Sequence, residues 1–245
     1  MESPTNPTLK ITDFDFIIAE AKKRGCVVVV DNTFATCYNQ QPVSMGADAV
    51  IHSCTKYVGG HSDVLMGVFC TNRKDLHDKL YEIRNVLGAV ANPFECYMCY
   101  RGLKTLAVRM EQHGKNALEL AEYLQSHPLV ESVNYPGLPS QKYHGLCKKY
   151  MRTGGGMLTF VMKGTLEQAK VFFKAVKLGI LAESLGAVET LLEIPALMTH
   201  ASVPPEFRKE LGIHDTLIRV SVGIEDIEDL KRDFDQALKV AAESG

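Results

Sequence analysis

The sequence predicts an α/β fold made of a mainly parallel sheet with its helices, followed by a smaller α+β domain. Three short runs of apolar, β-branched residues, at 26–30, 49–54 and 64–70, are typical of parallel strands buried on both faces. Segments with helical spacing alternate with these runs. After Pro128 the pattern changes to separate strands and helices. We therefore predict a large domain at residues 1–110 and a small domain at residues 111–245.

The helices and the later strands follow from periodicity and from stop signals. Residues 13–24 place apolar side chains at helical spacing and end at Gly25. A long helix that begins at Pro93 and continues to about residue 125 would bridge the two domains. Further predicted helices are 73–87, 166–177 and 226–241, and further strands are 130–134, 157–162 and 217–222.

Composition excludes several classes of protein. The chain has 245 residues, 46% of them hydrophobic and 23% charged, which predicts a globular protein with a sizeable core. A net charge of −2 with scattered signs leaves no basic face for nucleic acid or membrane. Seven irregularly spaced cysteines and no signal peptide indicate a reducing, cytoplasmic location. We expect small molecules and other subunits as partners.

Polar residues directly follow two of the predicted parallel strands. Asp31 comes after the first strand, and Ser53, Thr55 and Lys56 come at the end of the second. Ligands of open α/β sheets bind beyond the carboxyl ends of the strands. A lysine facing a carboxylate there suits pyridoxal phosphate (PLP), which needs an amine for its aldehyde and an acid for its ring nitrogen. A turn-forming Asp31 and a solvated Lys56 are the alternatives that this pattern leaves open.

Seven segments of the sequence resemble, in order, the signature segments of the Cys/Met-metabolism (transsulfuration) PLP enzymes. They are DNTF (31–34), SCTKYVGGHSD (53–63), RGLKTL (101–106), YPGLP (135–139), AESLG (182–186), MTHAS (198–202) and RVSVGIED (219–226). The resemblance covers essentially the whole chain and is closest to the cystathionine γ-lyases of the family. It implies the aminotransferase-like fold of PLP-dependent transferases (fold type I), with part of the large domain and the C-terminal small domain.

The resemblance implies a role for each residue of a cofactor site. Lys56 would be the Schiff-base lysine and the general base, and Asp31 would hold the pyridine nitrogen. Ser53 and Thr55 would bind the phosphate, and Asn6 would lie near the phenolic oxygen. No metal is expected, since the histidine and aspartate of GHSD (60–63) look like part of a structural turn.

The resemblance also implies a substrate site for an amino acid. Arg219 would bind the α-carboxylate, for which a planar bidentate guanidinium is well suited. Ser184 and Thr199 would line the substrate pocket, and Glu183 would lie near the distal end of the substrate. The alternatives are a surface ion pair for Arg219, turn or cap hydroxyls for the two hydroxyl residues, and a solvated charge for Glu183.

The expected activity is that of a carbon–sulfur lyase that cleaves L-cystathionine to cysteine, 2-oxobutanoate and ammonia. Cystathionine γ-synthase and methionine γ-lyase are alternatives within the family. A third alternative is a truncated, catalytically silent relative that acts only through oligomerisation. The turn-rich run at 2–10 looks like the middle of a loop, so the chain is expected to begin inside a domain. The resemblance implies that the family's N-terminal segment is missing. The family resemblance implies a homotetramer.

Overall fold

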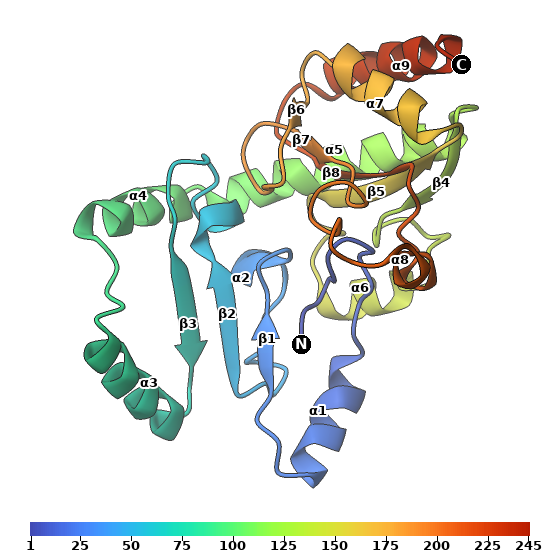
Figure 1. Ribbon diagram of the computed structural model, residues 1–245. Coiled ribbons are helices and arrows are strands. Elements are labelled where there is room, and N and C mark those ends of the chain that lie inside the picture. The colour runs from blue at the N-terminus through green and yellow to red at the C-terminus, as the bar shows by residue number, and fades with distance from the viewer.

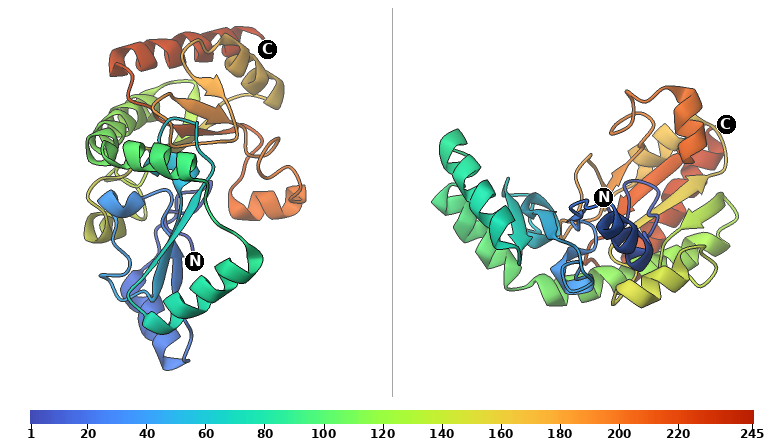
Figure 2. Two further views of the ribbon diagram at one scale, coloured as in Figure 1. Left: turned by 90° about the vertical axis from the view of Figure 1, so that its left-hand side faces the viewer. Right: turned by 90° about the horizontal axis from the view of Figure 1, so that it is seen from below.

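The computed structural model describes residues 1–245 and contains two separate sheets joined by helices (Figure 1). The first sheet has three strands in the order β1-β2-β3, and the second has five in the order β4-β5-β8-β7-β6. The N-terminal segment lies between the two sheets, as the view from below shows (Figure 2). It is held there by hydrogen bonds from the Met1 ammonium to the Val29 carbonyl and from Asn134 to the Thr8 carbonyl. This segment therefore contacts both parts of the molecule.

The first sheet contains one parallel and one antiparallel pairing. Its elements are α1 (Phe14–Lys23), β1 (Val29–Asp31), α2 (Thr36–Asn39), β2 (Ala49–Ser53), the π-helical turn η1 (Cys54–Val58) and β3 (Gly67–Thr71). Strand β1 is parallel to β2, as predicted, but β3 is antiparallel to β2. The prediction of a buried parallel strand at 64–70 is therefore wrong. The segment between β2 and β3 holds only the turn η1, so the chain reverses direction without the crossover that parallel pairing needs.

The long helix predicted from Pro93 is two helices. The elements here are α3 (Lys74–Leu87), α4 (Pro93–Leu103) and α5 (Leu106–Ser126). Thr105 has φ −108° and ψ 5°, which interrupts the helix. The predicted domain boundary at residue 110 falls inside α5, which packs on elements of both sheets. None of the helices combines the length and the apolar character needed to span a membrane.

Arg109 connects the two helices to the turn η1. Its guanidinium is buried and donates to the carbonyls of Tyr57 (2.7 Å), Val58 (3.3 Å) and Gly102 (2.8 Å). A carbonyl at the end of α4 and two carbonyls of η1 thus share one cation, and no carboxylate pairs with it. Because charge-assisted hydrogen bonds are stronger than neutral ones, Arg109 fixes α4 and α5 against the turn that carries Lys56.

The second sheet encloses the largest core. Its elements are β4 (Val130–Asn134), α6 (His144–Tyr150), β5 (Met157–Met162), α7 (Leu166–Ala175), β6 (Ile180–Leu181), β7 (Leu191–Glu193), α8 (Pro205–Leu211), β8 (Leu217–Ser221) and α9 (Ile227–Glu243). Phe160 on β5 packs edge-on or tilted against Phe172 of α7 and Phe234 of α9, with ring centroids about 6 Å apart. Asp226 caps α9 through the amides of Glu228 and Asp229. The predicted strands at 130–134, 157–162 and 217–222 and the predicted helices at 166–177 and 226–241 are present as β4, β5, β8, α7 and α9, whereas α6, β6, β7 and α8 were not predicted.

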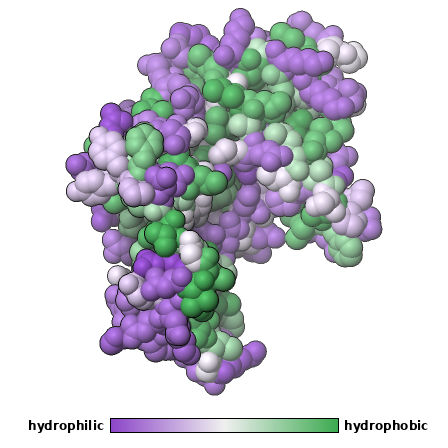
Figure 3. All heavy atoms as spheres, turned by 60° about the vertical axis from the view of Figure 1, so that its left-hand side comes forward, coloured by the Kyte–Doolittle hydropathy of each residue, from purple (hydrophilic) through white to green (hydrophobic).

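One side of the molecule carries many exposed apolar side chains (Figure 3). Helix α3 has no buried residue, and a cavity of about 480 Å³ lies between it and β3. We define the exposed apolar surface by Val68, Phe69, Val86, Leu87, Val90, Phe94 and Tyr97. A concentration of this kind marks an interaction surface more often than a free surface.

The contact between α4 and η1 leaves no room for a side chain at Gly102. A Cβ added there would collide with the carbonyl oxygens of Gly59 and Val58. We expect Gly102→Ala to lower the free energy of unfolding by about 1–3 kcal/mol, because the helix must move off the turn. Urea unfolding followed by circular dichroism measures this change.

Gly145→Ala is the matched control, because a Cβ at Gly145 in α6 meets nothing within 4 Å. This variant should be neutral or slightly more stable, since alanine is the better helix former. Equal destabilisation by both substitutions would contradict the proposed steric cause.

Candidate functional site

A buried ion pair between Arg219 and Glu193 lies at the centre of the site. The two residues are directly opposite on the neighbouring strands β8 and β7, and Arg219 Nη1 lies 2.8 Å from Glu193 Oε1. The exposed side-chain fractions are 2% and 0%. Thr199 Oγ1 donates to the same carboxylate oxygen at 2.9 Å. Removing two charges from water is costly unless they are paired and hydrogen-bonded, so the remaining partners of Arg219 matter.

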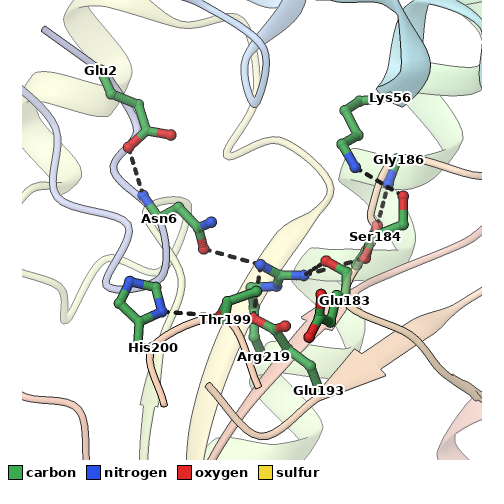
Figure 4. Close-up of polar contacts among 11 residues, drawn as sticks. Glu2, Asn6, Lys56, Glu183, Ser184, Gly186, Glu193, Thr199, His200 and Arg219 are labelled. Carbon is green, nitrogen blue, oxygen red and sulfur yellow. Dashed lines mark hydrogen bonds and ion pairs between the residues drawn. The ribbon is translucent and has the colours of Figure 1, made fainter. Parts of the chain in front are cut away.

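Those partners bring two further segments of the chain onto the guanidinium (Figure 4). Nη1 donates to Asn6 Oδ1 at 3.0 Å. Nη2 donates to the carbonyl oxygens of Glu183 at 2.7 Å and Ser184 at 3.2 Å. The hydrogen on Nε has no acceptor in the chain. Arg219 is therefore not the surface ion pair that the sequence left open.

Lys56 extends from η1 toward the same loop. Its Nζ donates to Ser184 Oγ at 2.9 Å. Lys56 and Arg219 therefore bind the same residue, the lysine through the side chain and the arginine through the backbone carbonyl. The lysine is half-buried. Burial lowers the pKa of Lys56 from its usual value, the positive charge of Arg219 lowers it further, and Glu193 opposes the shift. The neutral amine, which is the nucleophilic and basic form, is thus favoured relative to a free lysine.

Asp31, Ser53 and Thr55 lie at the carboxyl ends of β1 and β2, as the sequence predicted. Asp31 Oδ1 accepts from the Thr33 amide at 3.0 Å, and Thr33 Oγ1 accepts from the Ser53 amide at 2.9 Å. Thr55 Oγ1 accepts from the Met66 amide at 3.2 Å. The Ser53 hydroxyl and Asp31 Oδ2 have no hydrogen-bond partner in the chain. These atoms can therefore bind a ligand without losing a protein contact.

The predicted site residues fall into two groups. In the first group, polar contacts through Arg219, Glu193 or Ser184 connect six residues: Asn6, Lys56, Glu183, Ser184, Thr199 and Arg219. The second group lies at the strand ends and contains Asp31, Ser53 and Thr55. Asp31 and Lys56 make no direct contact. Glu183 takes part through its backbone carbonyl, while its carboxylate is exposed. Sequence reasoning missed Glu193, although a glutamate inside the apolar run LLEIP (191–195) is a signal of a buried, paired carboxylate.

Tyr57 and His113 pack against each other and stabilise η1, the turn that carries Lys56. Tyr57 is fully buried, and its ring packs edge-on against His113 with centroids 5.2 Å apart. The Nδ1 atom of His113 lies 2.7 Å from the Val222 carbonyl, directly after β8. Burial lowers the pKa of His113 to about 4. The histidine is therefore neutral at physiological pH and acts as a packing group.

Comparison with known proteins gives the site its context. Residues 1–239 match the family described as Cys/Met metabolism PLP-dependent enzyme. Cystathionine γ-lyase of Dictyostelium discoideum is 54% identical over 97% of this chain and 62% of its own length. Cystathionine γ-synthase of Xanthomonas oryzae, solved with aminoacrylate and cysteine, superposes with a TM-score of 0.97 at 42% identity, over 100% of this chain and 63% of its own.

A methionine γ-lyase of Micromonospora echinospora superposes with a TM-score of 0.92 at 40% identity, over 97% of this chain and 64% of its own. These similarities confirm the predicted fold class. The chain spans about three-fifths of the length of the proteins that it matches. The predicted roles of single residues stay predictions, because likeness of the whole chain does not test them.

The pKa of His113 makes stability depend on pH. The folded-state value of about 4 is below the ordinary value of 6.5, so the unfolded chain binds more protons between these two values. Stability from this group is full above pH 6.5 and is lost as the pH falls toward 4. We expect the free energy of unfolding to drop by about 2 kcal/mol from this group between pH 8 and pH 5.

Chemical denaturation at several pH values measures the effect, and His113→Asn is the control that removes the titrating group. The variant should lose that part of the pH dependence over pH 5–8. The same slope in both proteins would show that other groups cause it.

Proposed function

The chain belongs to the Cys/Met metabolism PLP-dependent enzyme family, and we propose that it acts as a carbon–sulfur lyase on L-cystathionine, releasing cysteine, 2-oxobutanoate and ammonia. The observation that carries this proposal is the half-buried amine of Lys56 beside the buried Arg219, with a pKa lowered by burial. This pairs a basic amine with a carboxylate-binding group. The seven free cysteines favour the proposed cytoplasmic location.

The residues present fit PLP, the cofactor of the family. Lys56 offers an amine for the aldehyde, and the free Asp31 Oδ2 can bind a protonated ring nitrogen. The unpartnered Ser53 hydroxyl can donate to a phosphate. Thr55 uses its oxygen only as an acceptor from Met66, so its own hydrogen is free to donate as well. We propose these four residues as the cofactor contacts.

When bound, PLP supplies an electron sink for negative charge that develops on the carbon atoms of an amino acid. The protein supplies the proton transfers. Lys56 has a depressed pKa and can take the Cα proton of the substrate as a neutral amine. The Ser184 hydroxyl accepts a hydrogen bond from Nζ at 2.9 Å and so orients the amine. Once the amine has given up the proton taken from Cα and is neutral again, it can take a proton from Cβ, which leads to loss of the sulfur substituent from Cγ.

Arg219 is proposed to bind the α-carboxylate of the substrate. Its Nε hydrogen is free, and its Nη1 contact to the neutral Asn6 amide is the one that a carboxylate can most easily replace. Asn6 is also the proposed neighbour of the phenolic oxygen. Thr199 keeps Glu193 in place at the wall of the pocket. The exposed carboxylate of Glu183 is suited to the ammonium at the distal end of cystathionine.

Cystathionine γ-synthase and methionine γ-lyase are the alternatives within the family, and both occur among the similar solved structures. These enzymes would use the same lysine and arginine. They differ in the group that leaves or attacks at Cγ, which lies beyond the contacts made by Arg219. The high identity to a cystathionine γ-lyase favours the lyase.

Replacement of Lys56 tests the cofactor assignment. After addition of PLP, the wild-type chain should absorb visible light, and borohydride reduction should attach the cofactor to residue 56, as mass spectrometry shows. Lys56→Ala should lose both signals, because no other half-buried amine faces Ser184. Lys79→Ala, an exposed lysine of α3, is the matched control and should retain them.

A substrate panel of cystathionine, methionine, homocysteine and O-acetylhomoserine separates the three activities. We expect 2-oxobutanoate from cystathionine at the highest kcat/KM. Faster methanethiol release from methionine, or cystathionine formation from O-acetylhomoserine and cysteine, would assign the chain to one of the alternatives.

A second candidate function is a catalytically silent relative that acts by joining oligomers. The exposed apolar surface favours an interaction there, because Val86, Leu87, Val90 and Phe94 are each 68–80% exposed. The family resemblance favours other copies of the chain as partner, in a homotetramer. An enzyme that works as an oligomer would use the same surface, so only the activity panel separates the two candidates.

We expect the chain to sediment as an oligomer and Phe94→Glu to shift it toward monomer, because a buried charge disfavours the contact. Analytical ultracentrifugation measures the change. Val240→Glu, on the opposite part of the molecule in α9, is the control and should leave the assembly unchanged. A monomeric wild-type chain would rule out self-association through this surface.

A further inference from the structure

Glu193 is a charged residue with no access to water. Its exposed fraction is 0%, and it lies on β7 among the apolar residues Leu191, Leu192 and Ile194. One carboxylate oxygen, Oε1, contacts Arg219 and Thr199. The other, Oε2, is buried without any hydrogen-bond partner. A carboxylate that only stabilised the sheet would be a costly choice here, because a hydrophobic residue would avoid the desolvation penalty.

The other contacts of Arg219 explain what Glu193 contributes. Asn6 and the carbonyls of Glu183 and Ser184 are neutral acceptors. Glu193 is thus the sole carboxylate within ion-pair distance of the guanidinium. Its Oε1 lies 2.8 Å from Nη1 and supplies the negative charge that balances Arg219.

We propose that Glu193 is a positioning residue of the amino-acid site, which fixes the guanidinium of Arg219 for the substrate carboxylate and limits the repulsion between Arg219 and Lys56. The proposal rests on the proposed function for its substrate, but its electrostatic part concerns only the side chains of this chain. Glu193 makes no hydrogen bond to Lys56, the proposed general base, and acts through its contact with Arg219.

The charges around Glu193 set the sign of the effect. They are Arg219 on β8, Lys56 on η1 and Glu183 in the loop before β7. His200, in the segment after β7, is not one of these charges, because burial and then Arg219 lower its pKa. The carboxylate of Glu193 favours the protonated form of Lys56, and Arg219 disfavours it. Loss of the carboxylate leaves the effect of Arg219 unopposed, so the pKa of Lys56 falls further.

Glu193→Gln tests the charge without changing the shape. Competitive acetylation of the cofactor-free chain with acetic anhydride, read by mass spectrometry of the peptide with residue 56, gives the pH midpoint of Lys56. We expect the midpoint to fall by about half a unit or more. Glu189 is an exposed glutamate in the loop before β7. Glu189→Gln is the matched control and should leave the Lys56 midpoint unchanged.

Glu193→Asp tests the position while keeping the charge. The shorter side chain cannot maintain the 2.8 Å contact from an unchanged strand, so Arg219 loses its fixed orientation. We expect the Lys56 midpoint to stay at the wild-type value and KM for the amino-acid substrate to rise about tenfold with little change in kcat.

Each variant can overturn the proposal independently, so failure of Glu193→Gln to fold leaves Glu193→Asp decisive. An unchanged Lys56 midpoint in folded Glu193→Gln, or an unchanged KM in Glu193→Asp, would refute the role of Glu193. Absence of PLP attachment to Lys56 in the wild-type chain would instead refute the proposed function. The acetylation result does not depend on the cofactor and distinguishes the two failures.

Discussion

The ion pair of Arg219 and Glu193 is the interaction on which the geometry of the site depends. Both charges lie out of water, and a buried charge is costly unless it is paired and hydrogen-bonded. Besides Glu193, Arg219 binds the N-terminal segment through Asn6 and the loop before β7 through two carbonyls, while Glu193 Oε2 keeps no partner in the chain. A single guanidinium therefore connects segments that are more than two hundred residues apart in the sequence.

A second buried cation performs the same kind of task for the lysine. Arg109 has no carboxylate partner and binds carbonyls of η1 and of the end of α4. Tyr57, the neighbour of Lys56, packs on His113 and against the segment that holds Gly186, whose backbone approaches the tyrosine amide closely. The turn is thus fixed from both sheets. As a result, Lys56 follows a strand of the first sheet yet hydrogen-bonds Ser184, which precedes a strand of the second.

The first sheet is less completely covered than the second. Strand β3 is exposed along nearly its whole length, and α3 buries none of its residues, whereas the five-stranded sheet packs a core of 27 buried residues. The relatives found by sequence and by structure are both longer than this chain, which covers 62% and 63% of their lengths. The exposed apolar surface and the unpartnered Ser53 hydroxyl and Asp31 Oδ2 all belong to this less covered part.

The sequence by itself determined the element types and the family. Periodicity predicted α1, α3 and, in the α+β part, β4, β5, β8, α7 and α9, because local spacing of apolar residues decides which face can be buried. The short elements α6, β6, β7 and α8 were not predicted. Periodicity also placed Asp31, Ser53, Thr55 and Lys56 after the correct strands. Family motifs pointed to Asn6, Ser184, Thr199 and Arg219.

Only the tertiary structure decided the direction of β3, the break between α4 and α5, and the partners of the charged groups. Strand direction depends on how the connection between β2 and β3 reverses the chain, the helix break lies at the non-helical backbone of Thr105, and Arg109 finds its acceptors in η1 and at the end of α4. Glu193 escaped sequence reasoning for the same reason. The apolar run around it signals a buried carboxylate, but its partner is an arginine on a neighbouring strand, and pairing between distant strands leaves no local pattern that identifies the partner.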